Sequence, residues 1–122
     1  MEEYFSYRRL RVYQQAKEVV ILVYKLLRSF PKEEQYALCD QLRRAAASVP
    51  SNIAEGMGRS SIKEQCHFIE IANASLNEVM CQLELAYELK LISDDDLRDS
   101  EDLIKSVAQM LFGLRKSILS KN

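Results

Sequence analysis

The sequence of 122 residues is 48% hydrophobic and 29% charged, with a formal net charge of −1. A chain of this length fits one domain that buries its own core, so we expect a single domain over residues 1–122. Three glycines and two prolines are too few for a turn-rich all-β protein, and this composition predicts an all-α fold. The near-zero net charge excludes recruitment of a polyanion by the overall field, so any nucleic-acid binding would need a local basic patch.

The cysteines, the start of the chain and the apolar runs predict its compartment. Cys39, Cys66 and Cys81 are odd in number and form no CxxC pair. Two glutamates follow the first methionine, unlike the basic start of a signal peptide. The longest unbroken apolar run, residues 19–24, is far shorter than the roughly 20 residues that a bilayer crossing needs. We therefore expect a soluble cytoplasmic protein with no membrane partner.

The first half of the chain predicts two long helices. Residues 10–29 contain no glycine or proline, and their apolar residues recur at helical spacing. A second helix is predicted over residues 32–57, where the apolar positions stay in phase across Pro50. We therefore expect one helix kinked at Pro50 instead of two helices. Gly56 and Gly58 are expected to end this helix with positive φ angles.

The second half predicts two more helices. Residues 61–90 open with a capping-box pattern in which Ser61 is the cap. Residues 94–119 follow Ser93, a predicted cap, and begin with three aspartates that suit the positive end of a helix dipole. This acidic run could attract a divalent cation, but helix entry explains it without one. Short links between long helices predict an antiparallel up-down-up-down four-helix bundle.

The apolar surface of these helices exceeds what one bundle core needs. Residues 19–24 are apolar around nearly the whole circumference of the first helix, and Phe112 lies on a second apolar line of the fourth. The alternative is a generously packed monomer, but broad apolar patches more often mark subunit contacts. We predict a homo-oligomer. Its expected contacts are Val20, Ile21, Leu22, Tyr24 and Phe112.

The second helix also carries a regular polar line, which is either a solvated face or a partly buried seam. Within the seam interpretation, Arg44, Asn52 and Glu55 hold the kinked region to a neighbouring helix or subunit. Glu78 is the expected acidic partner of Arg43 or Arg44, because an unpaired carboxylate at the edge of a core is costly. The predicted structural polar network is Arg43, Arg44, Asn52, Glu55 and Glu78.

Catalytic and metal-binding patterns lack support. His67 is the sole histidine, and its immediate neighbours provide no nucleophile and base pair. Cys66 and His67 are adjacent on a helix, so their side chains diverge by about 100° and do not share a metal. No phosphate loop of the GxxxxGK[ST] type is present. We expect no enzymatic activity, no catalytic residues, no metal and no cofactor.

The basic residues are concentrated near the start of the chain. Residues 1–29 hold six basic and three acidic side chains, whereas residues 60–92 hold two basic and five acidic ones. Arg8, Arg9 and Arg11 alternate with aromatic residues, a pattern suited to contacting phosphates and stacking bases, and Arg59 is a possible fourth contact. The simpler interpretation is an ordinary N-terminal segment whose aromatic side chains dock on the bundle.

Five segments together resemble one known family. They are Leu10-Arg11-Val12-Tyr13-Gln14-Gln15-Ala16, Phe30-Pro31 with Glu34, Gln41-Leu42-Arg43-Arg44-Ala45-Ala46, Asn52-Ile53-Ala54-Glu55-Gly56, and Ile71-Ala72-Asn73-Ala74-Ser75-Leu76-Asn77-Glu78. With them the chain resembles the bacterial 23S rRNA intervening-sequence proteins over nearly its whole length. Tyr13 stands where that family often has Trp, and Asn73-Ala74 replaces a basic residue and Gly.

The resemblance implies an antiparallel four-helix bundle that assembles into a ring-like homopentamer. Members of the family are similar to the accessory protein of diversity-generating retroelements, a basic barrel that engages nucleic acid and a reverse transcriptase. We therefore expect a non-enzymatic oligomeric scaffold or interaction protein. The alternative is a nucleic-acid-binding accessory protein.

Overall fold

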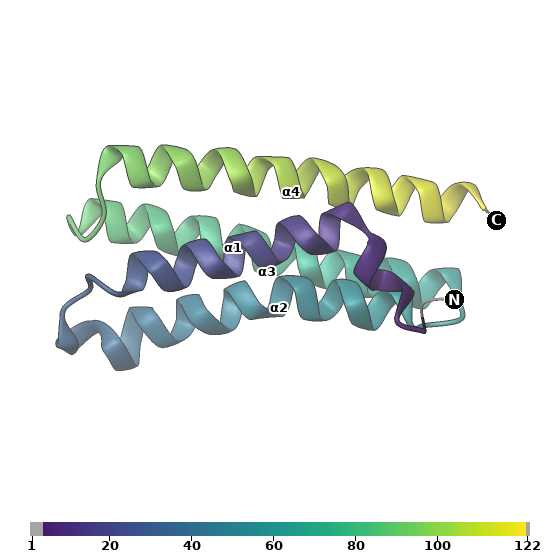
Figure 1. Cartoon of the computed structure of the whole chain (residues 1–122), viewed down its shortest axis with the longest axis horizontal. Helices are drawn as coiled ribbons and strands as arrows, with labels where there is room; N and C mark the ends of the chain where they lie inside the picture. The colour runs from purple at the N-terminus through teal and green to yellow at the C-terminus, as the bar shows by residue number, and fades with distance from the viewer. Residues whose placement is uncertain (1–3, 122) are drawn as a thin grey trace.

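Four long helices run alternately up and down, side by side, in the computed structural model (Figure 1). The structure describes residues 4–121, apart from the side chains of residues 35 and 36. The helices are α1 (Arg11–Leu27), α2 (Asp40–Met57), α3 (Ile62–Glu88) and α4 (Asp94–Ser120), and the described residues contain no strand. The predicted all-α four-helix bundle is confirmed.

Each helix packs on two neighbours. α1 packs on α2 and α4, and α3 packs on the same two helices, so the order around the bundle is α1, α2, α3, α4 (Figure 1). The face formed by α1 and α2 therefore lies opposite the face formed by α3 and α4. Both faces matter below, because each carries an apolar groove.

The core follows the helical spacing seen in the sequence. On α1 the buried residues recur every three or four positions and form the expected stripe. On α3 small residues such as Ala72 and Ala86 are fully buried, which lets neighbouring helices approach closely. Gly56 of α2 makes the same kind of contact, because a Cβ atom there would lie 3.0 Å from the Cβ atom of Phe68.

The start of the second helix differs from the prediction. A continuous helix was expected from residue 32, but Lys32–Glu34 form a 3₁₀ turn (η2) and Gln35–Cys39 a π-helical turn (η3) before α2 begins at Asp40. No side chain caps the turn that starts at Gln35, so nothing local enforces α-helical hydrogen bonding there. From Asp40 onward α2 continues without a break across Pro50, as expected of one helix.

The predicted glycine ends are wrong, whereas the predicted serine caps are confirmed. Neither Gly56 nor Gly58 has a positive φ, and Gly58 ends α2 at φ −87°. The Ser61 hydroxyl accepts a hydrogen bond from the Glu64 amide, and Ser93 forms a complete capping box at the start of α4. The three aspartates after Ser93 thus form the first turn of α4, as the helix-entry interpretation expected.

A short element before α1 was not predicted. Residues Ser6–Arg9 form a 3₁₀ turn (η1) that packs on both α1 and α2, at the end of the bundle where α2 finishes (Figure 1). Tyr7 from this turn stacks edge-on against Tyr13, with ring centroids 4.9 Å apart. Within residues 4–121, none of the helices has the length and apolarity that a membrane span requires.

Candidate oligomer interface

The face formed by α1 and α2 carries an open groove of about 480 Å³. Ile21 and Tyr24 of α1 are 57% and 47% exposed, and Val20 is partly buried. We name this the α1–α2 groove. It is lined by Tyr7, Tyr13, Lys17, Val20, Ile21, Ala47, Pro50, Ser51 and Ala54.

Cations accompany the aromatic rings on this face. The Lys17 ammonium lies 4.9 Å from the centroid of the Tyr13 ring, and the Arg43 guanidinium lies 5.8 Å from that of Tyr24. Both distances fall in the range of cation–π contacts, which stabilise the positions of the two rings on this face. The groove thus combines apolar side chains with a positive rim.

One predicted contact residue lies elsewhere on the same helix. Leu22 and Tyr24 are two residues apart, a rotation of about 200°, so they project from different sides of α1. Leu22 is partly exposed and does not line the α1–α2 groove. Of the predicted contacts on α1, Val20 and Ile21 line the groove, whereas Tyr24, one turn beyond them, and Leu22 do not.

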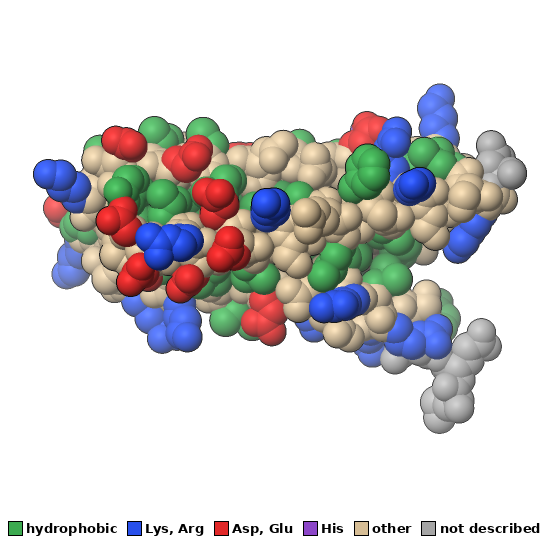
Figure 2. Space-filling view, turned by 90° about the horizontal axis from the view of Figure 1, so that it is seen from above, with side chains coloured by type: hydrophobic (Ala, Val, Ile, Leu, Met, Phe, Trp, Pro, Cys, Tyr) green, Lys and Arg blue, Asp and Glu red, His purple; other side chains and the backbone are tan. Residues whose placement is uncertain are grey.

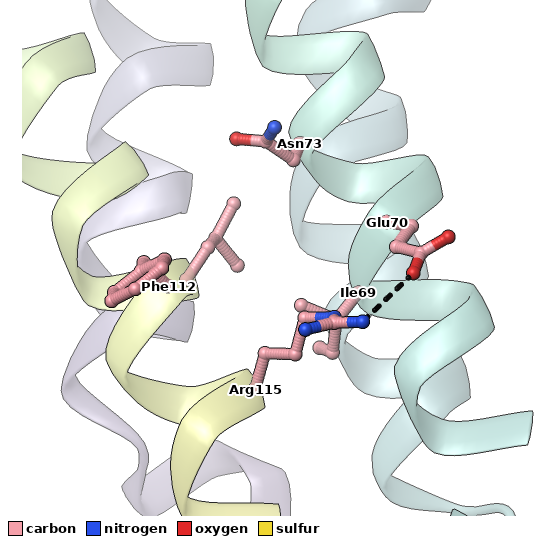
Figure 3. Close-up of a pocket in the computed structure, with 6 residues that line it drawn as sticks. Ile69, Glu70, Asn73, Phe112 and Arg115 are labelled. Atoms are coloured by element: carbon pink, nitrogen blue, oxygen red, sulfur yellow. Dashed lines mark hydrogen bonds and ion pairs between the residues drawn. The ribbon is translucent and has the colours of Figure 1, made fainter. Parts of the chain in front are cut away.

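The opposite face carries a second groove, of about 230 Å³, between α3 and α4. Phe112, which is 71% exposed, forms its apolar wall. Arg115 reaches from α4 to Glu70 on α3, with 3.4 Å between Nη2 and Oε1 (Figure 3). We name this the α3–α4 groove. It is lined by Ile69, Glu70, Asn73, Leu111, Phe112 and Arg115.

The predicted polar seam joins α2 and α3, with partners that differ from those expected. The hydroxyl groups of Ser48 and Ser75 are 2.8 Å apart. Asn52 donates to the Ser48 carbonyl at 2.7 Å and to its hydroxyl at 2.8 Å, so both of its hydrogen bonds stay within α2 and it is linked to α3 only through Ser48. Glu78 accepts a hydrogen bond from buried Gln82 at 3.0 Å.

The arginines of the predicted network do not reach Glu78. Arg43 pairs with Asp40, with 3.3 Å between nitrogen and oxygen, and lies on the α1 side of α2. Arg44 lines a groove together with Glu78, but no ion pair within 4.0 Å joins these two among residues 4–121. Glu55 instead pairs with Arg59 at 2.9 Å on the exposed helix surface, a contact worth a few tenths of a kcal/mol.

The basic residues singled out in the sequence lie at one end of the bundle. Arg8, Arg9 and Arg11 are exposed around η1 and the start of α1. The guanidinium groups of Arg8 and Arg59 lie over the rings of Phe5 and Phe68, each at 4.8 Å. Tyr7 docks on the bundle as the simpler interpretation expected, whereas Tyr4 and Phe5 remain exposed.

Charge is segregated along the bundle axis. We call the half that holds residues 4–18, 50–75 and 107–121 the basic end. It carries nine basic side chains against four acidic ones, whereas the other described half, residues 19–49 and 76–106, carries eight basic and twelve acidic ones. Figure 2 shows most of the acidic side chains of the α4 face gathered over the half where α4 begins.

The residues considered for catalysis or metal binding form no site in the part of the chain that the structure describes. His67 is exposed and packs edge-on against Phe68. No group of three potential metal ligands occurs among the described residues. The three cysteines are free thiols; Cys39 and Cys66 are buried and Cys81 is exposed. Burial raises the pKa of the Cys39 thiol, which keeps it protonated and unreactive.

Sequence reasoning missed Lys17, Glu70 and Arg115 as parts of the grooves. Glu70 and Arg115 are 45 positions apart, and only the packing of α3 on α4 brings them together. Lys17 carries a sequence signal, because it follows Tyr13 by four positions and precedes Ile21 by four on the same helical face.

The fold and its grooves define a small all-α bundle protein without an evident catalytic centre in its described part. The 23S rRNA-intervening sequence protein family model matches residues 8–113, and the chain belongs to this family. No curated protein matches the sequence.

A solved structure shares the fold. It is the crystal structure of a protein of unknown function from the S23 ribosomal protein family of Bacteroides thetaiotaomicron. The two chains are 20% identical and superpose with a TM-score of 0.79, over 86% of this chain and 95% of the other. At this identity the likeness confirms the four-helix architecture alone.

Proposed function

We propose that the protein is a non-enzymatic, homo-oligomeric scaffold or interaction module with a ring-like assembly. The observation that carries this proposal is the presence of two apolar grooves on opposite faces of one bundle. Burying a large apolar side chain contributes about 1.5–3 kcal/mol, so Ile21, Tyr24 and Phe112 give a large incentive to associate. The family resemblance implies five copies in the ring.

Light scattering coupled to gel filtration tests self-association. The native protein is expected to elute as one species of several copies at micromolar concentration, and a strictly monomeric species would contradict the proposal. Ile21→Lys is expected to dissociate the assembly, because it puts a charge among the apolar side chains that line the α1–α2 groove. Leu85→Lys is the matched control, since Leu85 is 51% exposed but lines neither groove.

Binding of nucleic acid is a second candidate function, favoured by the basic end. A ring of parallel copies would gather the basic ends into one continuous rim, even though each chain is nearly neutral. Phosphate contacts by such a rim would release counterions, which makes binding strongly dependent on salt. Arg8, Arg9, Arg11 and Arg59 lie in the half that would form this rim.

Fluorescence anisotropy with structured RNA and DNA across a salt series tests this second function. Replacing Arg8, Arg9 and Arg11 with Gln is expected to weaken binding and to reduce the salt slope by about one per lost phosphate contact. The matched control replaces Lys25, Arg28 and Lys32, three cations of the other half, with Gln. Equal losses in both triple variants, or no binding at low salt, would remove this candidate.

A further inference from the structure

The position of the α1–α2 groove along the bundle axis, which we call its height, can be compared with that of the groove on the opposite face. Ile21 is the last residue of α1 that lines the groove, and Ala47 is the first of α2; because the two helices are antiparallel, these residues mark one height at the same end of the groove. Ser48, which follows Ala47 by one residue, is joined to Ser75 of α3 by a 2.8 Å hydrogen bond. Ser75 thus lies at nearly the same height on α3.

The α3–α4 groove lies at that same height. Asn73 is two residues from Ser75, about 3 Å along the helix axis, and it lines the α3–α4 groove together with Phe112. Ile21 on one face and Phe112 on the opposite face are therefore within about 5 Å of the same height. Both side chains are more than half exposed.

A basic residue on the α1–α2 face and an acidic residue on the α3–α4 face also lie at nearly the same height, nearer the basic end. Lys17 precedes Ile21 by four residues, about 6 Å along α1. Glu70 precedes Asn73 by three residues, about 4.5 Å along α3, which runs in the same direction as α1. Glu70 accepts from Arg115 through Oε1. A carboxylate has a second oxygen, which leaves Oε2 able to accept from another cation.

We infer that the α1–α2 groove of one copy packs on the α3–α4 groove of a second copy that points in the same direction, with Ile21 against Phe112 and Lys17 against Glu70. This inference rests on the proposed self-association and names the residues that meet. The Lys17 ammonium binds Oε2 of the neighbouring Glu70, whose Oε1 keeps its own Arg115. The apolar pair and the charged pair together fix the axial register of the contact.

This register determines whether the assembly rises along the bundle axis. A contact between two different faces repeats from copy to copy, and it closes into a ring when the rotations from copy to copy add up to a full turn with no shift along the axis. An axial shift would instead build a rising filament. Because the matching residues lie at equal heights, the contact adds no rise, and every copy presents its basic end on the same side.

Cross-linking with a short bis-maleimide tests the contact. The double variant Lys17→Cys with Glu70→Cys is made in a Cys81→Ser background, which removes the one exposed native thiol. A ladder of covalent multimers is expected, because each copy then carries both halves of the contact. The two single variants are expected to give no ladder. Lys17→Cys with Lys105→Cys is the register control, because Lys105 lies about 15 Å from Arg115 along α4.

Three outcomes would overturn the inference while leaving self-association intact. They are an oligomer by light scattering with no ladder, dimers from either single variant, or a ladder from the register control. A monomeric parent protein would instead overturn the proposed function itself.

Charge reversal gives an independent measurement that needs no cross-linker. Lys17→Glu places a carboxylate against Glu70 of the neighbour, and the dissociation constant of the assembly is expected to rise about tenfold. Lys63→Glu makes the same charge change at an exposed position that lines neither groove, and it is expected to have little effect. Equal effects of the two reversals would overturn the charged pair.

Discussion

Lys90 adopts a left-handed backbone conformation, which is unfavourable for a residue that has a side chain. Its φ of 64° is the single positive φ among the described residues. Lys90 and Leu91 donate to the carbonyl groups of Tyr87 and Ala86, both at 2.9 Å, and these two bonds complete a Schellman motif at the end of α3. Helices with this motif usually place glycine where Lys90 stands, because a side chain makes the left-handed conformation costly.

Lys90→Gly is therefore expected to stabilise the protein. Removal of the side chain relieves about 1 kcal/mol of left-handed strain, against a smaller entropic cost in the unfolded chain. Urea denaturation of the variant and the native protein measures the difference. Lys90→Ala keeps a Cβ atom and should show no comparable gain; an equal gain would mean that the lysine side chain, not the backbone angle, was unfavourable.

Tyr87 makes stability depend on pH at alkaline values. Its hydroxyl donates a hydrogen bond to Asp94, and this bond together with the negative charge of Asp94 raises the pKa of Tyr87 above its usual value of 10. The folded state then holds the phenolic proton more tightly than the unfolded state. The stabilising contribution is complete below pH 10 and is lost as the pH rises from 10 through the raised pKa.

Tyr87→Phe separates this effect from that of other titrating groups. The free-energy difference of unfolding between the native protein and the variant should be constant from pH 7 to 9 and should shrink above pH 10. Chemical denaturation at a series of pH values measures it. A difference that is independent of pH up to 11 would show that Tyr87 does not titrate as inferred.

At the scale of elements, Gly56 and Gly113 allow the effect of helix packing on stability to be measured apart from the effect of helix propensity. A Cβ atom on Gly56 would lie 3.0 Å from the Cβ atom of Phe68 and 3.3 Å from the backbone oxygen of Gln65, and neither atom moves easily. A Cβ atom on Gly113 of α4 would meet nothing within 4 Å. The close approach of α2 to α3 therefore depends on Gly56.

The two alanine substitutions are expected to have opposite signs. Gly113→Ala should stabilise the protein by about 0.8–1 kcal/mol through helix propensity. Gly56→Ala gains the same propensity but forces α2 and α3 apart, with an expected net loss of about 1–2 kcal/mol. Thermal or urea unfolding measures both. Stabilisation by both substitutions would show that the helices separate without cost.

Sequence patterns predicted the starts of α1, α3 and α4 to within one residue, but they did not predict the start of α2. Ser61 and Ser93 carry their own capping oxygens, so α3 and α4 begin where a local signal says they should. The segment from residue 32 lacks such a cap, and its 3₁₀ and π turns were invisible to periodicity. The expectation that glycines with positive φ end the second helix was also wrong. Gly56 instead lies where α2 approaches α3 closely, and the positive φ belongs to Lys90.

At the scale of the whole molecule, self-association links stability to concentration. If the assembled state alone buries the two grooves, dilution favours dissociation and then unfolding. The melting temperature is expected to rise by about 5 °C or more when the protein concentration increases a hundredfold. Differential scanning calorimetry measures this, with Ile21→Lys as the monomeric reference whose melting temperature should not change with concentration.

The sequence by itself determined the helices, the buried stripes and the excess of apolar surface. These properties depend on spacings of three and four residues, which a single helix expresses without its neighbours. It also pointed to Val20, Ile21, Leu22, Tyr24 and Phe112 as apolar residues beyond the needs of the core.

The tertiary structure decided how these features are combined. It placed the grooves on opposite faces at one height and paired Glu70 with Arg115. It also paired Arg43 with Asp40 and joined Glu78 to Gln82 by a hydrogen bond. Such pairings depend on which helices are neighbours and how they are aligned along the axis. Residues distant in the chain meet through that packing, and local spacing carries no information about it.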